Sequence, residues 1–171
     1  LSADLLPKQQ VPMEAHLVDL CDKIAYLSHD LDDGLRAGLL TEPQVAELPL
    51  WRLAQESAGS TLRQRILSEV ASLMIHDLVE TADSLPGVTV PGAPQPRLQH
   101  SPGMAVKSQE VLEFLRTNFY RSPRVLAVMD DGAARIRRLF ASLRDKPAQL
   151  PEPHQKRIAH DGLERTICDY V

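Results

Sequence analysis

Apolar residues recur at spacings of three and four from Leu17 to Leu35, and this pattern constrains the fold more than any other feature of the chain. The spacing predicts a helix from Met13 to about Leu40 with one apolar side. That side consists of Leu17, Leu20, Cys21, Ile24, Leu27, Leu31 and Leu35. No segment alternates between apolar and polar residues for long enough to form a sheet. We therefore predict an all-α, multi-helix fold.

The remaining helices are predicted from the same spacing, together with Ser, Thr and Pro residues that begin helices and Pro and Gly residues that end them. They cover about 42–48, 61–85, 107–120, 123–143, 154–160 and 162–171. Residues 86–106 contain five prolines, at positions 86, 91, 94, 96 and 102, which predicts a loop.

Charge and cysteine content exclude several classes of function. A formal net charge of −4 gives no general attraction to nucleic acid or to an anionic membrane. Cys21 and Cys168 lie in helical patterns without a CxxC motif, so we expect two reduced core residues rather than a zinc site.

The chain contains neither a signal peptide nor an apolar run of about 18 residues, which predicts a cytoplasmic protein that makes no membrane contact. It has no initiator Met, and its last helical pattern is still running at Val171. We therefore expect it to be a piece of a longer protein.

The side of the first long helix opposite the apolar residues carries an almost purely acidic stripe. Its residues lie within an arc of roughly 100° on a helical wheel. They are Asp19, Asp22, Tyr26, His29, Asp30 and Asp33. A solvated polar face is the ordinary explanation of such a stripe. Binding is favoured instead by the scarcity of interleaved cations and by the Tyr and His side chains, since hard divalent cations prefer carboxylate oxygen.

Asp22, Tyr26 and Asp30 climb this helix at intervals of about 6 Å. With this spacing they suit successive parts of an elongated ligand better than a single ion. A carboxylate followed by a tyrosine and a second carboxylate suggests a metal and then a sugar or phosphate.

Residues 14–38, EAHLVDLCDKIAYLSHDLDDGLRAG, resemble the segment that closes the metal site in bacterial dGTP triphosphohydrolase-like proteins, which are HD-type deoxynucleoside-triphosphate triphosphohydrolases. The resemblance continues through residues 48–51, resumes at 114–125 and returns at 168–171, so it covers nearly the whole chain. Cys21 and Lys23 depart from the family pattern, and Lys23 can alter the local potential. The family's first metal-binding His and its His-Asp pair precede the matching segment, so the chain resembles the C-terminal half of such a protein.

This resemblance implies that Asp22 is the last ligand of a divalent metal of the Mg or Mn class. Tyr26 would lie near the sugar and phosphates of a deoxynucleoside triphosphate, and Asp30 near the sugar 3′-hydroxyl. His29 is a further candidate for contacting the substrate or orienting its neighbours. The reaction of the parent protein would convert a deoxynucleoside triphosphate and water into deoxynucleoside and triphosphate. Because the other metal ligands lie elsewhere, we expect no efficient turnover by the chain alone.

The resemblance also implies a domain organisation and partners. Residues 1–58 would be the C-terminal part of the HD domain, and residues 59–171 an HD-associated helical region that contains the Pro-rich loop. The partners would be the missing N-terminal HD segment and further copies of the parent protein.

Three His-Asp dipeptides, at 29–30, 76–77 and 160–161, are not expected to be the metal-binding pair, because the family places that pair earlier. Asp77 is expected to cap or pair within its own helix, and Tyr120 to pack against helix ends.

Guanidinium groups suit phosphate, but we expect Arg63 and Arg65 to pair at the surface. The arginines of residues 121–144 fit a solvated helix face better than a contact with subunits or single-stranded DNA. The alternative to a hydrolase is a non-catalytic helical module that binds nucleotide, DNA or sister subunits, and an H…HD pattern upstream in the parent gene would separate the two.

Overall fold

A computed structural model describes residues 13–85 and 98–171, and within these ranges it contains helices and no strand. The all-α prediction is confirmed. The chain divides into two compact units, Leu1–Tyr120 and Arg121–Val171.

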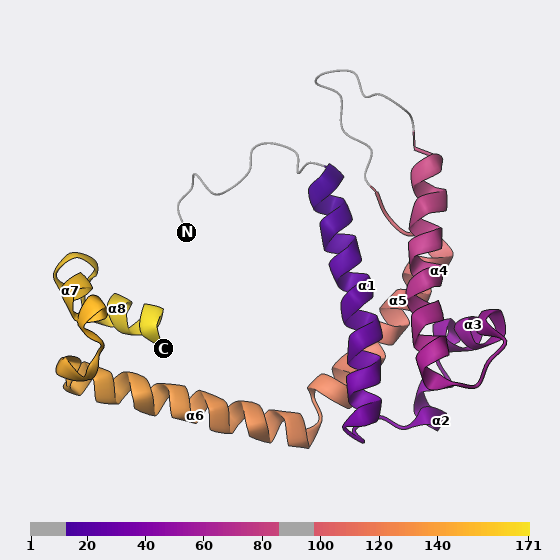
Figure 1. The fold of residues 1–171 in the computed structure, drawn as a ribbon. Helices are drawn as coiled ribbons and strands as arrows, with labels where there is room; N and C mark the ends of the chain where they lie inside the picture. Colours follow the sequence, from indigo (N-terminus) through magenta and orange to yellow (C-terminus); the bar gives the residue numbers. More distant parts are fainter. Residues whose placement is uncertain (1–12, 86–97) are drawn as a thin grey trace. The chain divides into compact units, whose positions relative to one another are not determined.

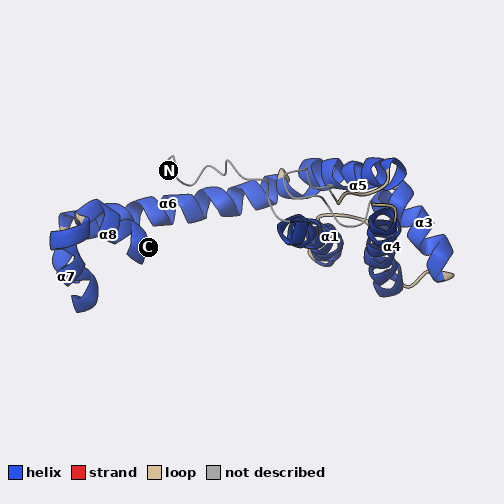
Figure 2. Ribbon diagram, turned by 90° about the horizontal axis from the view of Figure 1, so that it is seen from above, coloured by secondary structure: helices blue, strands red, loops and turns tan. Residues whose placement is uncertain are grey.

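The described part of the first unit contains five α-helices and a short π-helix (Figure 1). They are α1 Met13–Arg36, α2 Glu42–Val45, α3 Pro49–Ala58, α4 Arg63–Asp83, α5 Pro102–Leu115 and η2 Arg116–Tyr120. Helices α1 and α4 pack side by side and run antiparallel, and α5 lies across them (Figure 2). Helix α3 packs against both α4 and α5.

The core of the first unit lies among these helices, and the apolar side of α1 contributes to it as predicted. Ile24, Leu27, Leu31 and Leu35 are buried, and they pack with buried residues of the other helices. Those partners include Trp51, Val70, Met74, Val111 and Leu115.

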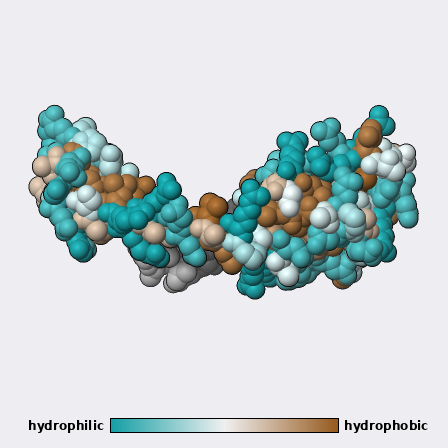
Figure 3. Space-filling view, turned by 90° about the horizontal axis from the view of Figure 1, so that it is seen from below, coloured by the Kyte–Doolittle hydropathy of each residue, from teal (hydrophilic) through white to brown (hydrophobic). Residues whose placement is uncertain are grey.

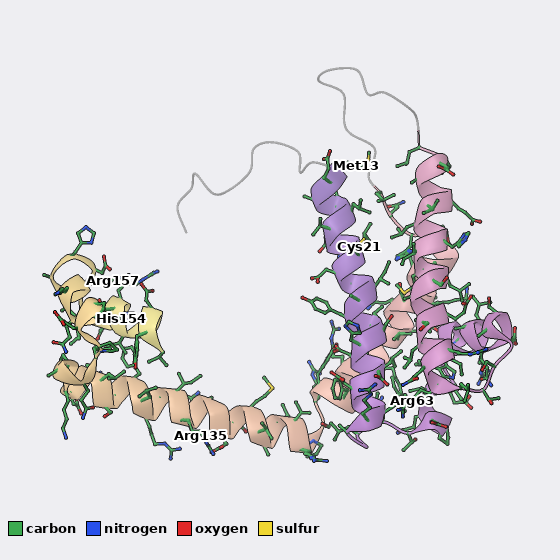
Figure 4. The ribbon with its side chains drawn as sticks, in the orientation of Figure 1. Met13, Cys21, Arg63, Arg135, His154 and Arg157 are labelled. Atoms are coloured by element: carbon green, nitrogen blue, oxygen red, sulfur yellow. The ribbon has the colours of Figure 1, made fainter. Side chains whose placement is uncertain are left out.

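The prediction that both cysteines belong to the core is wrong. Cys21 and Cys168 are free thiols, and both are exposed. Cys21 lies toward the N-terminal part of α1 (Figure 4), where an apolar groove of about 330 Å³ separates it from Ile75 and Val79 of α4. Because α4 does not close over this part of α1, Leu17 is also 46% exposed.

Two Ser-Pro pairs begin helices in the same way. The hydroxyls of Ser101 and Ser122 accept hydrogen bonds from the third amide that follows each, and a proline occupies the first helical position, where its missing N–H costs nothing. The second pair was predicted as a helix start. The first was predicted as part of the loop, so α5 begins five residues earlier than the expected position 107. Residues 86–97 of the predicted loop lie outside the described residues.

The second unit contains α6 Pro123–Asp145, a 3-10 turn η3 Pro147–Gln149, α7 Glu152–Asp161 and α8 Leu163–Tyr170. Its core is small and consists of buried Leu143, Leu150 and Ile167. Among the apolar residues of α6, Leu143 is buried but Val128, Ile136 and Leu139 are exposed.

The unit boundary after Tyr120 differs from the domain boundary predicted near residue 58, because α3 packs against α4 across that position. The assignment of residues 1–58 to an HD domain stays a prediction. None of the described helices is long and apolar enough to cross a membrane.

Candidate functional site

The acidic stripe of α1 lies on the side turned away from the core. Asp22 and His29 are exposed, Tyr26 is 57% exposed, and Asp30 is partly buried. Near the middle of the stripe, the hydroxyl of Tyr26 hydrogen-bonds the carboxylate of Asp22 one turn earlier. This hydrogen bond, and next the negative charge of Asp22, raise the pKa of the Tyr26 phenol. Tyr26 therefore stays protonated at neutral pH and donates to Asp22.

A second tyrosine approaches the stripe from η2. The Tyr120 hydroxyl donates a short hydrogen bond to the Asp30 carboxylate, although the two residues are 90 positions apart in sequence. Burial raises the pKa of Tyr120, and the hydrogen bond to Asp30 raises it further. Its ring also packs against Phe119, with centroids 5.5 Å apart. We expected Tyr120 only to pack against helix ends, but it also hydrogen-bonds Asp30, one of the predicted substrate-binding side chains.

A cavity of about 330 Å³ lies between these two tyrosines. Its apolar wall is formed by Leu27, Met74 and Leu112 of three different helices. Its polar lining comes from Lys23, Tyr26, His100, Ser108, Gln109 and Tyr120. Mixed linings of this kind, mostly apolar with a few convergent polar groups, are typical of small-molecule sites.

Asp77 links α4 to the start of α5, close to this cavity. Its Oδ2 atom is 2.8 Å from Nδ1 of His100 and accepts a 3.0 Å hydrogen bond from the Ser101 amide, while Oδ1 accepts a short one from the Ser101 hydroxyl. Burial opposes ionisation of Asp77, but the hydrogen bonds from Ser101 and His100 outweigh it and lower the pKa of Asp77. The ionised carboxylate can only accept, so Nδ1 of His100 carries a proton and Nε2 is the acceptor in the neutral ring.

The prediction that Asp77 caps or pairs within its own helix is therefore wrong. Its partners follow 23 and 24 residues later in the chain, and they bring His100 to the cavity. Sequence reasoning did not single out His100, and it assigned Tyr120 only to packing. For Tyr120 a signal existed, because it lies in the segment 114–125 on which the family resemblance rests.

An arginine pair surrounds Asp32 on the flank of α1. Arg36 Nε lies 2.7 Å from Asp32 Oδ2, and Arg63 Nε of α4 lies 3.5 Å from Oδ1. The second contact is an ion pair without hydrogen-bond geometry, since both of its atoms are without hydrogen-bond partners. Arg63 therefore pairs with a carboxylate, as expected.

The described residues contain no cluster of three or more His, Cys, Asp or Glu side chains that could hold a metal ion. In the second unit, His160 Nδ1 lies 2.6 Å from Asp161 Oδ1, but the histidine is 92% exposed and the carboxylate is paired with Arg157. Asp22 presents its carboxylate on an exposed helix face, and carboxylate oxygen is the kind of donor that hard divalent cations prefer.

Comparison with known proteins gives relatives over nearly the whole chain. Residues 98–171 match the model of the phosphohydrolase-associated domain. The chain is 35% identical over 99% of its length to deoxyguanosinetriphosphate triphosphohydrolase-like protein 1 of Deinococcus radiodurans, of which it covers 49%. A deoxyguanosinetriphosphate triphosphohydrolase-like protein of Geobacter metallireducens is 30% identical over 97% of the chain, which covers 47% of that relative.

The matched associated domain begins before α5 and crosses the boundary between the two units, so it is not a separate structural body. The chain spans about half the length of the curated relatives it matches. Over nearly its whole length the chain is thus similar to deoxyguanosinetriphosphate triphosphohydrolase-like proteins.

Proposed function

We propose that this chain contributes one metal ligand and the nucleoside-binding residues to a deoxynucleoside-triphosphate triphosphohydrolase. The observation that carries the proposal is the pairing of two stripe carboxylates with two tyrosines that line the same cavity. Tyr26 bonds Asp22, and Tyr120 bonds Asp30. The relatives' names support a phosphohydrolase family, and the reaction on a deoxynucleotide is our proposal.

The paired side chains have distinct tasks in this proposal. Tyr26 donates to one part of the Asp22 carboxylate, which leaves further lone pairs for a cation and holds the carboxylate in one orientation. Asp30 accepts the hydrogen bond of the sugar 3′-hydroxyl, while Tyr120 holds it in place from the other side. The aromatic and aliphatic wall of the cavity excludes water from the bound nucleoside.

A divalent metal of the Mg or Mn class, when bound, would supply charge stabilisation for the phosphate and a more nucleophilic water. Asp22 is the residue of this chain that would hold it. Since one carboxylate is too few for a stable site, we propose that the N-terminal HD segment of the parent protein completes the ligand set. The 171-residue chain alone should then have little activity.

The test is Asp22→Ala in the full-length parent protein, with triphosphate release from dGTP measured at a series of manganese concentrations. We expect the rate to fall by about 1000-fold or more, because metal catalysis supplies several kcal/mol. Asp19→Ala is the matched control. It removes a carboxylate three residues earlier on the same helix, one that is exposed and paired with Lys23. A full rate and an unchanged metal requirement in Asp22→Ala would rule out the ligand role.

The alternative function is a non-catalytic helical module that binds nucleotide, DNA or sister subunits. The arginines of α6 are the feature that would contact single-stranded DNA, and Arg135 projects from this helix (Figure 4). Its guanidinium already pairs with the Asp131 carboxylate at 2.8 Å, which makes Arg135 a weaker candidate for contacting DNA. An unmutated parent protein that binds DNA and does not hydrolyse dGTP would favour the module.

A further inference from the structure

The wall of the cavity between the two tyrosines carries a histidine to which the proposed reaction gives no task. The side chain of His100 is only 9% exposed, and it lines the cavity together with Leu27, Met74 and Leu112. Hydrophobic side chains also come to the surface of the first unit elsewhere, among hydrophilic ones (Figure 3). Apolar surface alone therefore does not single out this cavity, whereas a nearly buried imidazole in its wall does.

The orientation of the His100 ring is fixed by Asp77. Nδ1 of His100 lies 2.8 Å from Oδ2 of Asp77, and the amide and hydroxyl of Ser101 hold the same carboxylate. The Ser101 hydroxyl oxygen also accepts from the Met104 amide, which anchors the group at the beginning of α5. Because Asp77 takes up the hydrogen on Nδ1, the neutral ring presents Nε2 as a hydrogen-bond acceptor.

The charges around the cavity decide which part of a nucleotide suits this wall. Under the proposed function, on which this inference rests, Asp22 holds the metal and hence the phosphates, and Asp22 is exposed on the side of α1 turned away from the core. Among the described residues, Lys23 is the one lysine or arginine that lines the cavity, and it is already paired with Asp19 at 2.7 Å. A triphosphate would lose its water against the apolar wall without a free counter-charge. The uncharged base fits there instead.

The polar atoms of this wall favour a base that donates hydrogen bonds. Ser108 donates its hydroxyl hydrogen to the Ala105 carbonyl at 3.0 Å, so its oxygen is left as an acceptor, like Nε2 of His100. Guanine presents two adjacent donors, N1–H and the 2-amino group. Adenine presents its 6-amino group beside the acceptor N1, and two acceptors that face each other leave both without a hydrogen bond. The wall therefore favours guanine over adenine.

We propose that His100 recognises the nucleobase in this cavity and selects guanine by accepting a hydrogen bond at Nε2. Asp77 is the positioning residue that holds the ring in the accepting tautomer. The apolar wall supplies contact area for either purine, and the acceptors distinguish between them.

The substitution His100→Asn separates recognition of the base from support of the fold. The asparagine amide can still donate to Asp77 from about the place of Nδ1, but the acceptor at Nε2 is lost. His76→Asn is the matched control, because His76 is exposed and precedes Asp77 in the same helix. Both are made in the 171-residue chain. Binding of deoxyguanosine and of deoxyadenosine is measured by isothermal titration calorimetry at pH 8, where imidazoles are mostly neutral.

The wild-type chain and His76→Asn should bind deoxyguanosine at least about tenfold more tightly than deoxyadenosine. His100→Asn should lower this preference about fivefold, as expected for one lost hydrogen bond, mainly by weakening the binding of deoxyguanosine. A wild-type chain that binds both nucleosides equally or binds neither would overturn the inference without any variant. A His100→Asn chain with the full preference would also overturn it.

Kinetics of the full-length parent protein separate this inference from the proposed reaction. The ratio of kcat/KM for dGTP to that for dATP should fall in His100→Asn by the same factor as the binding preference. If the parent hydrolyses neither nucleotide while the chain still shows the His100-dependent preference, the proposed reaction is wrong and recognition of guanine by His100 is supported. If the parent hydrolyses dGTP and the ratio is unchanged in His100→Asn, the reaction stands and the role of His100 does not.

Discussion

Tyr120 and Asp30 form the contact on which the proposed nucleoside site most depends. Asp30 is partly buried, and a carboxylate that loses water needs a donor to keep its charge. Tyr120 supplies that donor, and its own raised pKa keeps the phenol protonated at neutral pH. The hydrogen bond also fixes the rotamer of Asp30, because the Tyr120 ring is itself packed against Phe119. Tyr120 is thus a positioning residue for Asp30.

Replacing Tyr120 by Phe should therefore impair recognition of the sugar 3′-hydroxyl. In the full-length parent protein, we expect the ratio of kcat/KM for dGTP to that for the 2′,3′-dideoxy analogue to fall about tenfold, which corresponds to about 1.4 kcal/mol. The dideoxy analogue lacks the group that Asp30 binds, so its own kcat/KM should change little. Steady-state kinetics with both nucleotides measures the ratio.

Tyr170→Phe is the matched control, since it removes a phenol hydroxyl from an exposed ring in α8 that packs on His154. It should leave the ratio unchanged. If Tyr120→Phe lowers kcat/KM for both nucleotides equally, Tyr120 supports the fold of the site and has no part in reading the 3′-hydroxyl.

At the scale of single helices, the end of α1 depends on two glycines with different tasks. Gly38 has a positive φ of 66°, which favours glycine, and it follows the last helical residue Arg36. Gly34 is buried within the helix, and the returning chain packs Leu40 against it. The amides of Leu39 and Leu40 both donate to the Gly34 carbonyl at 2.9 Å, so the chain folds back directly over this residue.

Gly34→Ala should destabilise the first unit even though alanine is the better helix former. The added Cβ would lie 2.5 Å from Cδ1 and 2.7 Å from Cγ of Leu40, a side chain that is only 2% exposed and has little room to move. We expect a loss of about 1–3 kcal/mol from overpacking, partly offset by about 1 kcal/mol of helix propensity. Urea unfolding followed by circular dichroism measures it.

Gly103→Ala is the corresponding control in α5, where the nearest atom is the mobile Nζ of Lys107 at 3.8 Å. It should be neutral or stabilising. A Gly34→Ala chain as stable as the wild type would mean that Leu40 repacks freely.

Sequence periodicity predicted which side of α1 is buried, but not how far along the helix the burial extends. Ile24, Leu27, Leu31 and Leu35 follow the prediction because α4 and α5 cover them. Leu17 and Cys21 carry the same periodic signal, yet they remain exposed because burial depends on a neighbour that periodicity does not describe.

The candidate site could likewise be predicted from the sequence only in part. Asp22, Tyr26 and Asp30 could be placed together from one helix, because their spacing alone puts them on one face. Tyr120, the partner of Asp30, lies 90 residues away in sequence, and His100, the partner of Asp77, lies 23 residues away. These pairs form only when the helices pack together, which the spacing of residues within one helix does not predict.

At the scale of the whole chain, the two units differ greatly in the size of their cores. The first unit buries a continuous cluster contributed by five helices. The second unit, residues 121–171, buries only Leu143, Leu150 and Ile167. A core this small gives little stability to about 50 residues, so the second unit should unfold at lower denaturant concentration.

This order of unfolding can be measured by hydrogen exchange and mass spectrometry in increasing urea, with peptides from α6 and α8 reporting the second unit and peptides from α1 and α4 the first. Peptides of the second unit should lose their protection at the lower urea concentration, because only Leu143, Leu150 and Ile167 form its buried core. Ile136→Asp is the matched control in α6, since this side chain is 57% exposed and should leave the midpoint of the second unit unchanged. Loss of protection in both units at the same urea concentration would mean that they unfold as one, and the size of the second core would then not set its stability.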